Sequence, residues 1–229
     1  MAYNEDETLE QLKSWWASWG TLVLLGISVA LFAFAGWRYW TNTRYESAAQ
    51  AQVLQQQMMT AMQRLSTSAD DKAASSDLQR LGHRLMDDYA GTPYAVDAAW
   101  LLARRAVEQN DLAGAEKLLR WALEHKTSAD AAALTQVRLA RVLSARKQYP
   151  AALDLLKSVN DKGLAPMVDE ARGDIALLQG DRAAARAAYQ AADAALAARD
   201  EARPVLELKL ADVGLAPATR KSDQVMEAK

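Results

Sequence analysis

Residues 103–122 read ARRAVEQNDLAGAEKLLRWA, and this stretch decides the fold because its spacing of small and large residues recurs twice downstream. A small residue comes first, an alanine follows twelve positions later, a large apolar residue four beyond that, and another apolar residue after three more. The three sets are Ala103, Ala115, Leu119 and Ala122; Ala140, Ala152, Leu156 and Val159; and Gly173, Ala185, Tyr189 and Ala192. The copies are 37 and 33 residues apart, a period typical of repeated helical hairpins.

Helix breakers separate the two halves of each copy, at Asn110-Asp111, Tyr149-Pro150 and Gly180-Asp181. Small residues allow two antiparallel helices to cross closely, and large residues at the next turn fill the space between pairs. One hairpin cannot cover its own apolar face, so neighbouring hairpins stack. This pattern resembles tetratricopeptide repeats, and we expect about three of them within residues 93–200. A generic alanine-rich helical bundle is the alternative.

The composition favours an all-α protein. Hydrophobic residues make up 51% of the 229, whereas glycines number 10 and prolines 5, and alanine and leucine, which have high helix propensity, dominate. The formal net charge of −2 gives no electrostatic reason to expect nucleic acid. The chain has no cysteine, and we find no zinc-ligand spacing, phosphate-binding glycine loop or serine nucleophile motif. We therefore predict no enzyme activity, no cofactor, no metal and no small-molecule substrate.

The segment from Ser14 to Trp37 carries no charge. As a helix its roughly 24 residues extend about 36 Å, more than the roughly 30 Å of a lipid hydrocarbon core. Aromatic residues and one arginine flank it as they flank membrane spans at the interface. These interface residues are Trp15, Trp16, Trp19, Trp37, Arg38, Tyr39 and Trp40. We predict a single transmembrane helix over residues 14–40, with membrane lipid as its surroundings.

Two alternatives compete with a transmembrane helix. The first is a buried core helix, which the length and the flanking tryptophans disfavour. The second is a cleaved signal peptide, because Ala33-Phe34-Ala35 before Gly36 fits the small-residue cleavage pattern. A signal peptide requires a basic amino end, whereas the chain begins with acidic residues, namely Glu5, Asp6, Glu7 and Glu10.

The sequence divides into five parts. Residues 1–13 form a short amino-terminal segment and 14–40 the span. A membrane-proximal helix over 41–65 carries an apolar stripe, Met-rich at Met58 and Met62, that either packs on the following domain or forms a partner groove. A tetratricopeptide-like repeat domain covers 66–216, and a polar, disordered tail covers 217–229.

Two details of the repeat domain are predicted more finely. Ser66 to Asp77 reads as a polar linker, followed by a helix from Asp77 to Tyr89. After Pro204, residues 205–210 form either a terminal helical cap or, because their apolar residues partly alternate, a strand.

The order of an acidic amino end, one span, Gly36-Trp37-Arg38-Tyr39-Trp40, an apolar helix and degenerate repeats resembles the YfgM family of ancillary SecYEG translocon subunits. Residues 138–142 (RLARV) and Arg172-Gly173-Asp174 with Gly180-Asp181 are similar to that family too. The resemblance implies a bacterial inner-membrane protein with a cytoplasmic amino terminus and a periplasmic repeat domain. It also implies two partners: the translocon, and an anchored periplasmic chaperone of the peptidyl-prolyl isomerase type that receives secreted proteins.

The basic residues of the repeats are the candidate partner-binding site. They are Arg104, Arg105, Arg138, Arg141, Arg146 and Lys147, and stacked hairpins expose a concave surface on which such residues gather. Trp100 and Trp121 belong either to this surface or, more commonly for tryptophan, to the core. The alternative functions are an anchored assembly factor or scaffold subunit of another envelope complex, and a signalling adaptor facing the cytoplasm. Charge alone does not choose the orientation, since only Lys13 precedes the span and Arg38 and Arg44 follow it.

Overall fold

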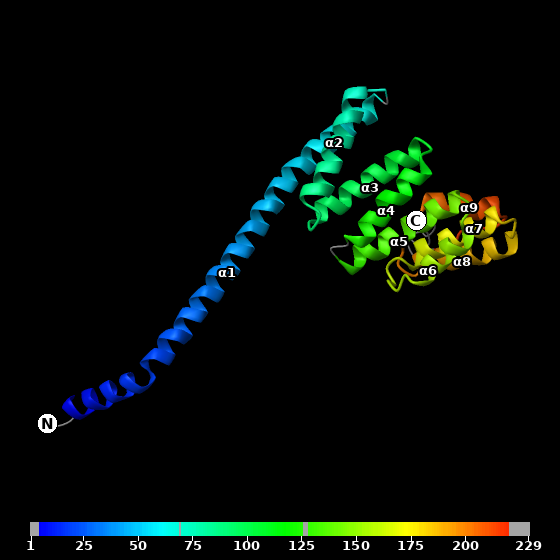
Figure 1. The fold of residues 1–229 in the computed structure, drawn as a ribbon. Helices are drawn as coiled ribbons and strands as arrows, with labels where there is room; N and C mark the ends of the chain where they lie inside the picture. The colour runs from blue at the N-terminus through cyan, green and yellow to red at the C-terminus, as the bar shows by residue number, and fades with distance from the viewer. Residues whose placement is uncertain (1–4, 69, 126–127, 220–229) are drawn as a thin grey trace, which may run out of the picture. The chain divides into compact units, whose positions relative to one another are not determined.

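The computed structural model describes residues 5–68, 70–125 and 128–219, with the backbone alone at 5–8, 10–12 and 39–46. Its regular elements are all helices in these ranges (Figure 1), as predicted. They are α1 (Glu5–Thr67), α2 (Lys72–Asp88), α3 (Pro93–Glu108), α4 (Leu112–Glu124), α5 (Ala129–Ala145), α6 (Tyr149–Lys157), α7 (Ala165–Leu178), α8 (Arg182–Ala197) and α9 (Pro204–Asp212). The chain forms two units, residues 1–50 and 51–229, described in turn.

The first unit contains the one stretch of the described chain that is long and apolar enough to cross a membrane, Lys13–Arg38 within α1. Its side chains are exposed: Phe32 is 80% accessible and Trp37 64%. A core helix of a soluble domain would be mostly buried, so that alternative is wrong. Trp15, Trp16 and Trp19 are also exposed, as is Arg38, whereas the side chains of Tyr39 and Trp40 lie outside the described ones.

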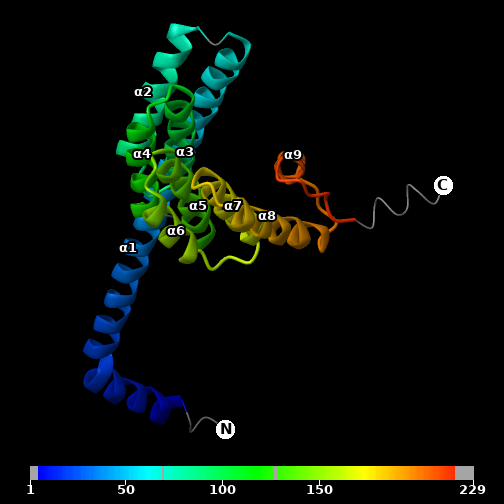
Figure 2. The same ribbon diagram turned by 90° about the vertical axis from the view of Figure 1, so that its right-hand side faces the viewer.

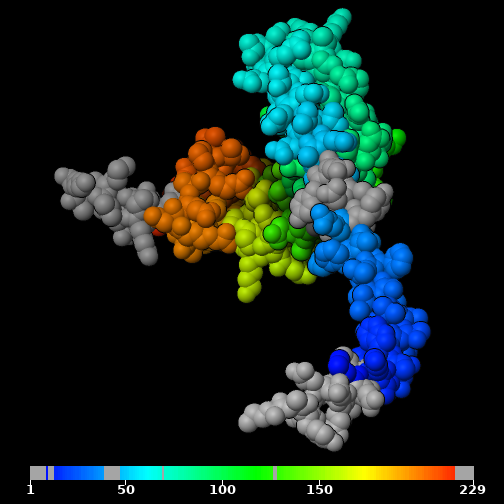
Figure 3. All heavy atoms as spheres, turned by 90° about the vertical axis from the view of Figure 1, so that its left-hand side faces the viewer, coloured from blue at the N-terminus to red at the C-terminus, as the bar shows by residue number. Residues whose placement is uncertain are grey.

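In the second unit, residues 51–67 of α1 pack against α2 and α3 around one core. Buried residues at three- and four-residue intervals, Ala51, Leu54, Met58 and Leu65, supply the α1 face of this core. The space-filling view shows residues 51–67 and α2 as one continuous block (Figure 3). The predicted apolar stripe therefore packs on the following helices.

Glycine allows α2 to pack closely in this core. A Cβ atom at Gly82 would lie 2.7 Å from Cδ1 of Leu102 in α3 and 3.0 Å from Cε of Met58 in α1. The helix itself begins at Lys72, five residues before the predicted start, because the Asp71 carboxylate accepts a hydrogen bond from the Ala74 amide at 2.9 Å. The linker predicted over 66–77 is correspondingly shorter.

The three predicted repeats are the hairpins α3–α4, α5–α6 and α7–α8 (Figures 1 and 2). Eleven of the twelve residues in the repeated pattern are buried. Val159 is the exception and is partly buried, because α6 already ends at Lys157. In the last hairpin the small residue faces the large one: a Cβ atom at Gly173 would lie 2.4 Å from Cε1 of Tyr189.

The turns inside these hairpins share one geometry. Asn110, Lys147 and Gly180 have φ values of 61°, 63° and 82°, and they lie at the same 37- and 33-residue intervals as the repeats. The following amide donates to a carbonyl five residues back, for example Asp111 N to Ala106 O at 2.8 Å, which is the Schellman ending of a helix. A left-handed turn residue followed by a new helix therefore recurs in each copy.

The last helix, α9, closes the stack. Leu206 and Leu210 are buried against α8 residues Tyr189, Ala192 and Leu196. Residues 205–210 are helical, so the strand alternative is wrong and the predicted terminal cap is confirmed. At the start of the predicted tail, the Ala218 amide donates to Asp193 at 2.5 Å, and residues 220–229 lie outside the described chain.

Ion pairs join α9 and the residue before it, Arg203, to α7. Glu170, which is 3% exposed, accepts hydrogen bonds from Arg203 and Lys209, both at 2.7 Å. Lys209 also donates to Asp174 at 2.7 Å, and Asp174 accepts from the Tyr189 hydroxyl at 2.9 Å. The buried carboxylate thus has basic partners, which offset the loss of its hydration.

Candidate functional site

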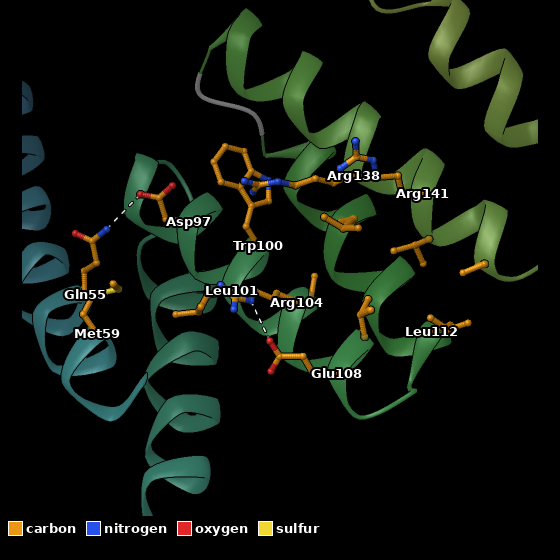
Figure 4. A pocket seen from close by; sticks show the side chains of 15 residues that line it. Gln55, Met59, Asp97, Trp100, Leu101, Arg104, Glu108, Leu112, Arg138 and Arg141 are labelled. Carbon is orange, nitrogen blue, oxygen red and sulfur yellow. Dashed lines mark hydrogen bonds and ion pairs between the residues drawn. The ribbon is translucent and has the colours of Figure 1, made fainter. Parts of the chain in front are cut away.

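A groove of about 820 Å³ lies on the second unit, with walls from α1, α3 and α5 and a floor from α4. Figure 4 shows Gln55 and Met59 of α1 on one side and Arg138 and Arg141 of α5 on the other. The residues lining it are Gln55, Met59, Asp97, Trp100, Leu101, Ala103, Arg104, Val107, Glu108, Leu112, Leu119, Arg138, Arg141, Val142 and Ala145. First helices of successive hairpins therefore supply most of the surface, as the stacking of repeats predicts.

Trp100 is held in place at the centre of the groove. Its indole Nε1 donates to the Thr135 hydroxyl at 2.9 Å, and Thr135 in turn donates to the Ala131 carbonyl at 2.6 Å. The Arg138 guanidinium carbon lies 4.2 Å from the centroid of the Trp100 ring, a cation–π arrangement. Trp100 is partly buried, so it contributes to the core and to the groove at once.

Acidic and amide groups line the α1–α3 side. The Gln55 amide donates to the Asp97 carboxylate at 3.2 Å. Burial raises the pKa of Asp97 above its ordinary value, and the positive charge of Arg138 opposes this shift. Burial conversely lowers the pKa of Arg138, opposed by Asp97. The charges of Asp97 and Arg138 therefore attract each other within the groove.

Three of the six basic residues predicted to bind partners come together in the groove, namely Arg104, Arg138 and Arg141. Arg104 pairs with Glu108 along α3 at 3.0 Å. Arg141 differs, because its Nε and Nη2 are buried and have no hydrogen-bond partner among the described residues. Arg141 instead forms an ion pair with Glu170 of α7, whose carboxylate lies 3.7 Å from Nη2.

The other three basic residues are not lining residues of the groove. Arg105 pairs with Glu108 at 3.3 Å and is largely buried. Arg146 forms an ion pair with Glu116 of α4. Lys147 is the left-handed residue of the α5–α6 turn and is exposed.

Other residues that line the groove were not predicted from the sequence, above all Asp97, Glu108, Gln55 and Met59. A signal for them exists. Asp97, Leu101, Arg104 and Glu108 recur at three- and four-residue intervals on α3, and such spacing places side chains on one helical face. Applying that periodicity to the charged and apolar residues together would have found this face. Trp121, the second tryptophan considered, is partly buried and stacks on His125, with ring centroids 4.1 Å apart.

The described residues offer the groove no metal-binding group: they hold no set of three or more His, Asp or Glu side chains that could bind an ion. Its polar groups are charged pairs, one amide and one indole, arranged beside exposed apolar side chains. Such a surface is suited to recognising a polypeptide.

Several known proteins are similar to this chain in sequence. A family model described as a tetratricopeptide repeat-like domain matches residues 13–215, so the match includes the span. An ancillary SecYEG translocon subunit from Escherichia coli strain K12 is 30% identical over 82% of this chain and 86% of its own length.

Relatives of the same name occur in Haemophilus influenzae and Neisseria gonorrhoeae. The first is 27% identical over 84% of this chain and 91% of its own length. The second is 25% identical over 90% and 95%, respectively. On this similarity, together with the hairpin repeats described above, the chain belongs to the YfgM family of ancillary SecYEG translocon subunits, built as an apolar helix followed by a tetratricopeptide-like repeat domain.

Proposed function

We propose that the chain is a non-catalytic adaptor, anchored in the bacterial inner membrane and associated with the SecYEG translocon. The observation that carries this proposal is that similarity to translocon subunits extends over most of the chain, and that the family match includes the span as well as the repeats. An exposed apolar helix provides an anchor, and stacked hairpins provide a protein-binding surface.

Its action is the hand-over of secreted proteins from the translocon to a periplasmic chaperone of the peptidyl-prolyl isomerase type. The amino terminus lies in the cytoplasm and the repeat domain in the periplasm. This orientation and the chaperone follow from the family resemblance of the membrane exit at residues 36–40 and of the repeats. The numbers of basic residues on the two sides of the span differ too little to argue against this orientation.

The partner-binding surface is the basic set predicted from the sequence, and the groove favours Arg104, Arg138 and Arg141 within it. These three line one concave surface beside Trp100, whereas Arg105, Arg146 and Lys147 are not among its lining residues. Replacing the three groove arginines with alanine reduces partner capture, while replacing Arg186, an exposed arginine of α8 outside the basic set, leaves it unchanged.

Affinity purification of the full chain from membranes solubilised in mild detergent tests the association. We expect SecYEG subunits to be enriched over every other envelope complex, as quantified by mass spectrometry. Enrichment of a different complex, with SecYEG at the level of an unrelated single-span protein, would instead identify a scaffold subunit of that complex.

Protease treatment of spheroplasts tests the orientation. We expect added protease to digest the repeat domain in intact spheroplasts, because that domain faces the periplasm. Protection that is lost only after lysis would place the repeats in the cytoplasm and support a signalling adaptor there.

A further inference from the structure

The helix α1 changes direction near its amino end, within the dark-blue part of the first unit (Figures 1 and 2). Two local features lie in this part of the helix. The Ser18 hydroxyl donates to the Ser14 carbonyl at 3.0 Å, and hydroxyl bonds of this kind bend helices. Gly20 lets the Trp16 ring lie against the backbone, since a Cβ atom there would lie 3.1 Å from Cε2 of Trp16. The helix therefore has a distinct amino-terminal arm, residues 5–19.

The part of α1 after this arm is long enough to cross a membrane without it. The roughly 19 residues from Gly20 to Arg38 extend about 28 Å as a helix. That length is close to the roughly 30 Å of the hydrocarbon core, which about 20 apolar residues span. The arm is therefore free to take another position at the membrane.

The amino-terminal arm has one apolar and one polar face. Its large apolar residues recur at three- and four-residue intervals, which places them on one face of a helix; they are Leu9, Leu12, Trp15, Trp16 and Trp19. The opposite face carries Asp6, Glu7, Glu10 and Ser14. The side chains of Leu9 and of the three tryptophans are between 48% and 55% exposed. The apolar face of the arm is therefore open to a partner.

We infer that the amino-terminal arm lies in the plane of the membrane surface, with its apolar face in the boundary between lipid headgroups and acyl chains. An amphipathic helix binds there by burying its apolar face, and tryptophan is enriched at that depth. The arm continues directly into the span, so the lipid surface is the partner nearest to it. Lys13 is its one basic residue, and apolar burial rather than attraction to anionic lipid holds it in place. This inference rests on the proposed membrane anchoring.

Single cysteines in the full chain test the inference, because the sequence contains no other cysteine. Each cysteine carries a nitroxide label, and the chain is inserted into nanodiscs of phosphatidylcholine, both faces of which are open to solvent. The measured quantity is the ratio of nitroxide collisions with oxygen, which concentrates in lipid, to collisions with a water-soluble nickel chelate. Two pairs compare the opposite faces of the arm: Leu9→Cys with Glu7→Cys, and Leu12→Cys with Glu10→Cys.

Reference positions calibrate the ratio for lipid and for water. Val29→Cys lies in the span, where the side chain is 61% exposed. Asp154→Cys lies on α6, where the side chain is 73% exposed. We expect a lipid-like ratio at positions 9 and 12 and a water-like ratio at positions 7 and 10, because a helix in the membrane plane turns one face to lipid and the other to water. Agreement of the two pairs shows that no single substitution has distorted the helix.

Two other patterns would overturn the inference. An upright arm that prolongs the span gives a steady change of the ratio from position 7 to position 12, since each residue lies about 1.5 Å deeper than the one before it. An arm that stays in solution, and so leaves its apolar face to a soluble protein, gives equal, water-like ratios within each pair.

Failure of this inference and failure of the proposed anchoring give different results. If position 29 has a lipid-like ratio while the four arm positions do not alternate, the inference about the arm fails alone. If position 29 also has a water-like ratio, the anchoring in the proposed function fails with it.

Discussion

Gly173 illustrates how single residues set the repeat geometry. A methyl group there would lie 2.4 Å from Cε1 and 2.5 Å from Cδ1 of Tyr189, and the ring is buried and fixed by its hydroxyl bond to Asp174. We expect Gly173→Ala to lower the free energy of unfolding by about 1–3 kcal/mol, the range for overpacking a core. Denaturant unfolding measures it. Gly91→Ala, where the added methyl meets nothing within 4 Å, is the control, and equal loss in both variants would contradict the account.

Glu170 makes stability depend on pH. Burial raises its pKa, but the hydrogen bond from Lys209 and the charges of Lys209, Arg141 and Arg203 together lower it below its ordinary 4.5. The folded chain then binds this proton less tightly than the unfolded chain. The ionised carboxylate therefore stabilises the fold at pH values above 4.5, and that stabilisation is lost as the pH falls through the lowered pKa.

The matching variant is Glu170→Gln, which leaves Arg203 and Lys209 without their carboxylate. We expect a loss of about 1–3 kcal/mol at neutral pH, below the usual cost of breaking a fully buried pair because both basic side chains are partly exposed. The variant should also lose less stability than the unaltered chain on acidification below pH 4.5. Asp154→Asn, which removes an exposed pair with Lys157, should change stability by under about 0.5 kcal/mol. If the free energy of unfolding of Glu170→Gln fell on acidification by the same amount as that of the unaltered chain, this role of Glu170 would be contradicted.

Among the helices, α9 offers a direct test of the terminal cap. Leu206 is 1% exposed and Leu208, two residues later on the same helix, is 72% exposed. We expect Leu206→Ala to cost about 2–5 kcal/mol, as for a buried leucine, and Leu208→Ala to cost under about 0.5 kcal/mol. Thermal unfolding followed by circular dichroism measures both. Similar melting temperatures for the two variants would show that α9 does not cover the core of the last hairpin.

Helical elements were predictable where spacing dictates packing. Ala115, Ala152 and Ala185 are fully buried. Each lies twelve positions after the small residue of its copy, which places it on the face of the second helix of the hairpin that packs against the first. The start of α2 was not predictable from composition: Lys72 to Ser76 look like a linker, and a single hydrogen bond from the Ala74 amide to the Asp71 side chain sets the boundary. The form of 205–210 likewise depends on burial of Leu206 and Leu210 against α8.

The groove was only partly predictable for a related reason. The arginines on α3 and α5 are visible in the sequence as basic runs, but their partners decide which of them face the groove. Arg146 lies close to Arg141 in sequence, yet it forms an ion pair with Glu116 of the preceding hairpin. Such contacts join residues 30 positions apart, and local periodicity carries no information about them.

The adaptor function of the entire chain requires that the span anchors the repeats to a membrane. Charged side chains at the centre of a span oppose insertion by about 2.5–3.5 kcal/mol each. We therefore expect Leu24→Arg with Leu25→Arg to release the chain from membranes, as fractionation and immunoblotting would show. Leu118→Ala with Leu123→Ala, in the repeat domain, should leave membrane attachment unchanged. Equal retention of the arginine variant would mean that something other than this helix holds the chain.

The most direct test of the anchor is the intact mass of the chain that resists extraction of membranes with alkaline carbonate. We expect the chain to stay in the membrane pellet with a mass that includes residues 14–40. A soluble species whose mass corresponds to a chain beginning at Gly36 would contradict it, since the apolar helix would then be a signal peptide removed by cleavage.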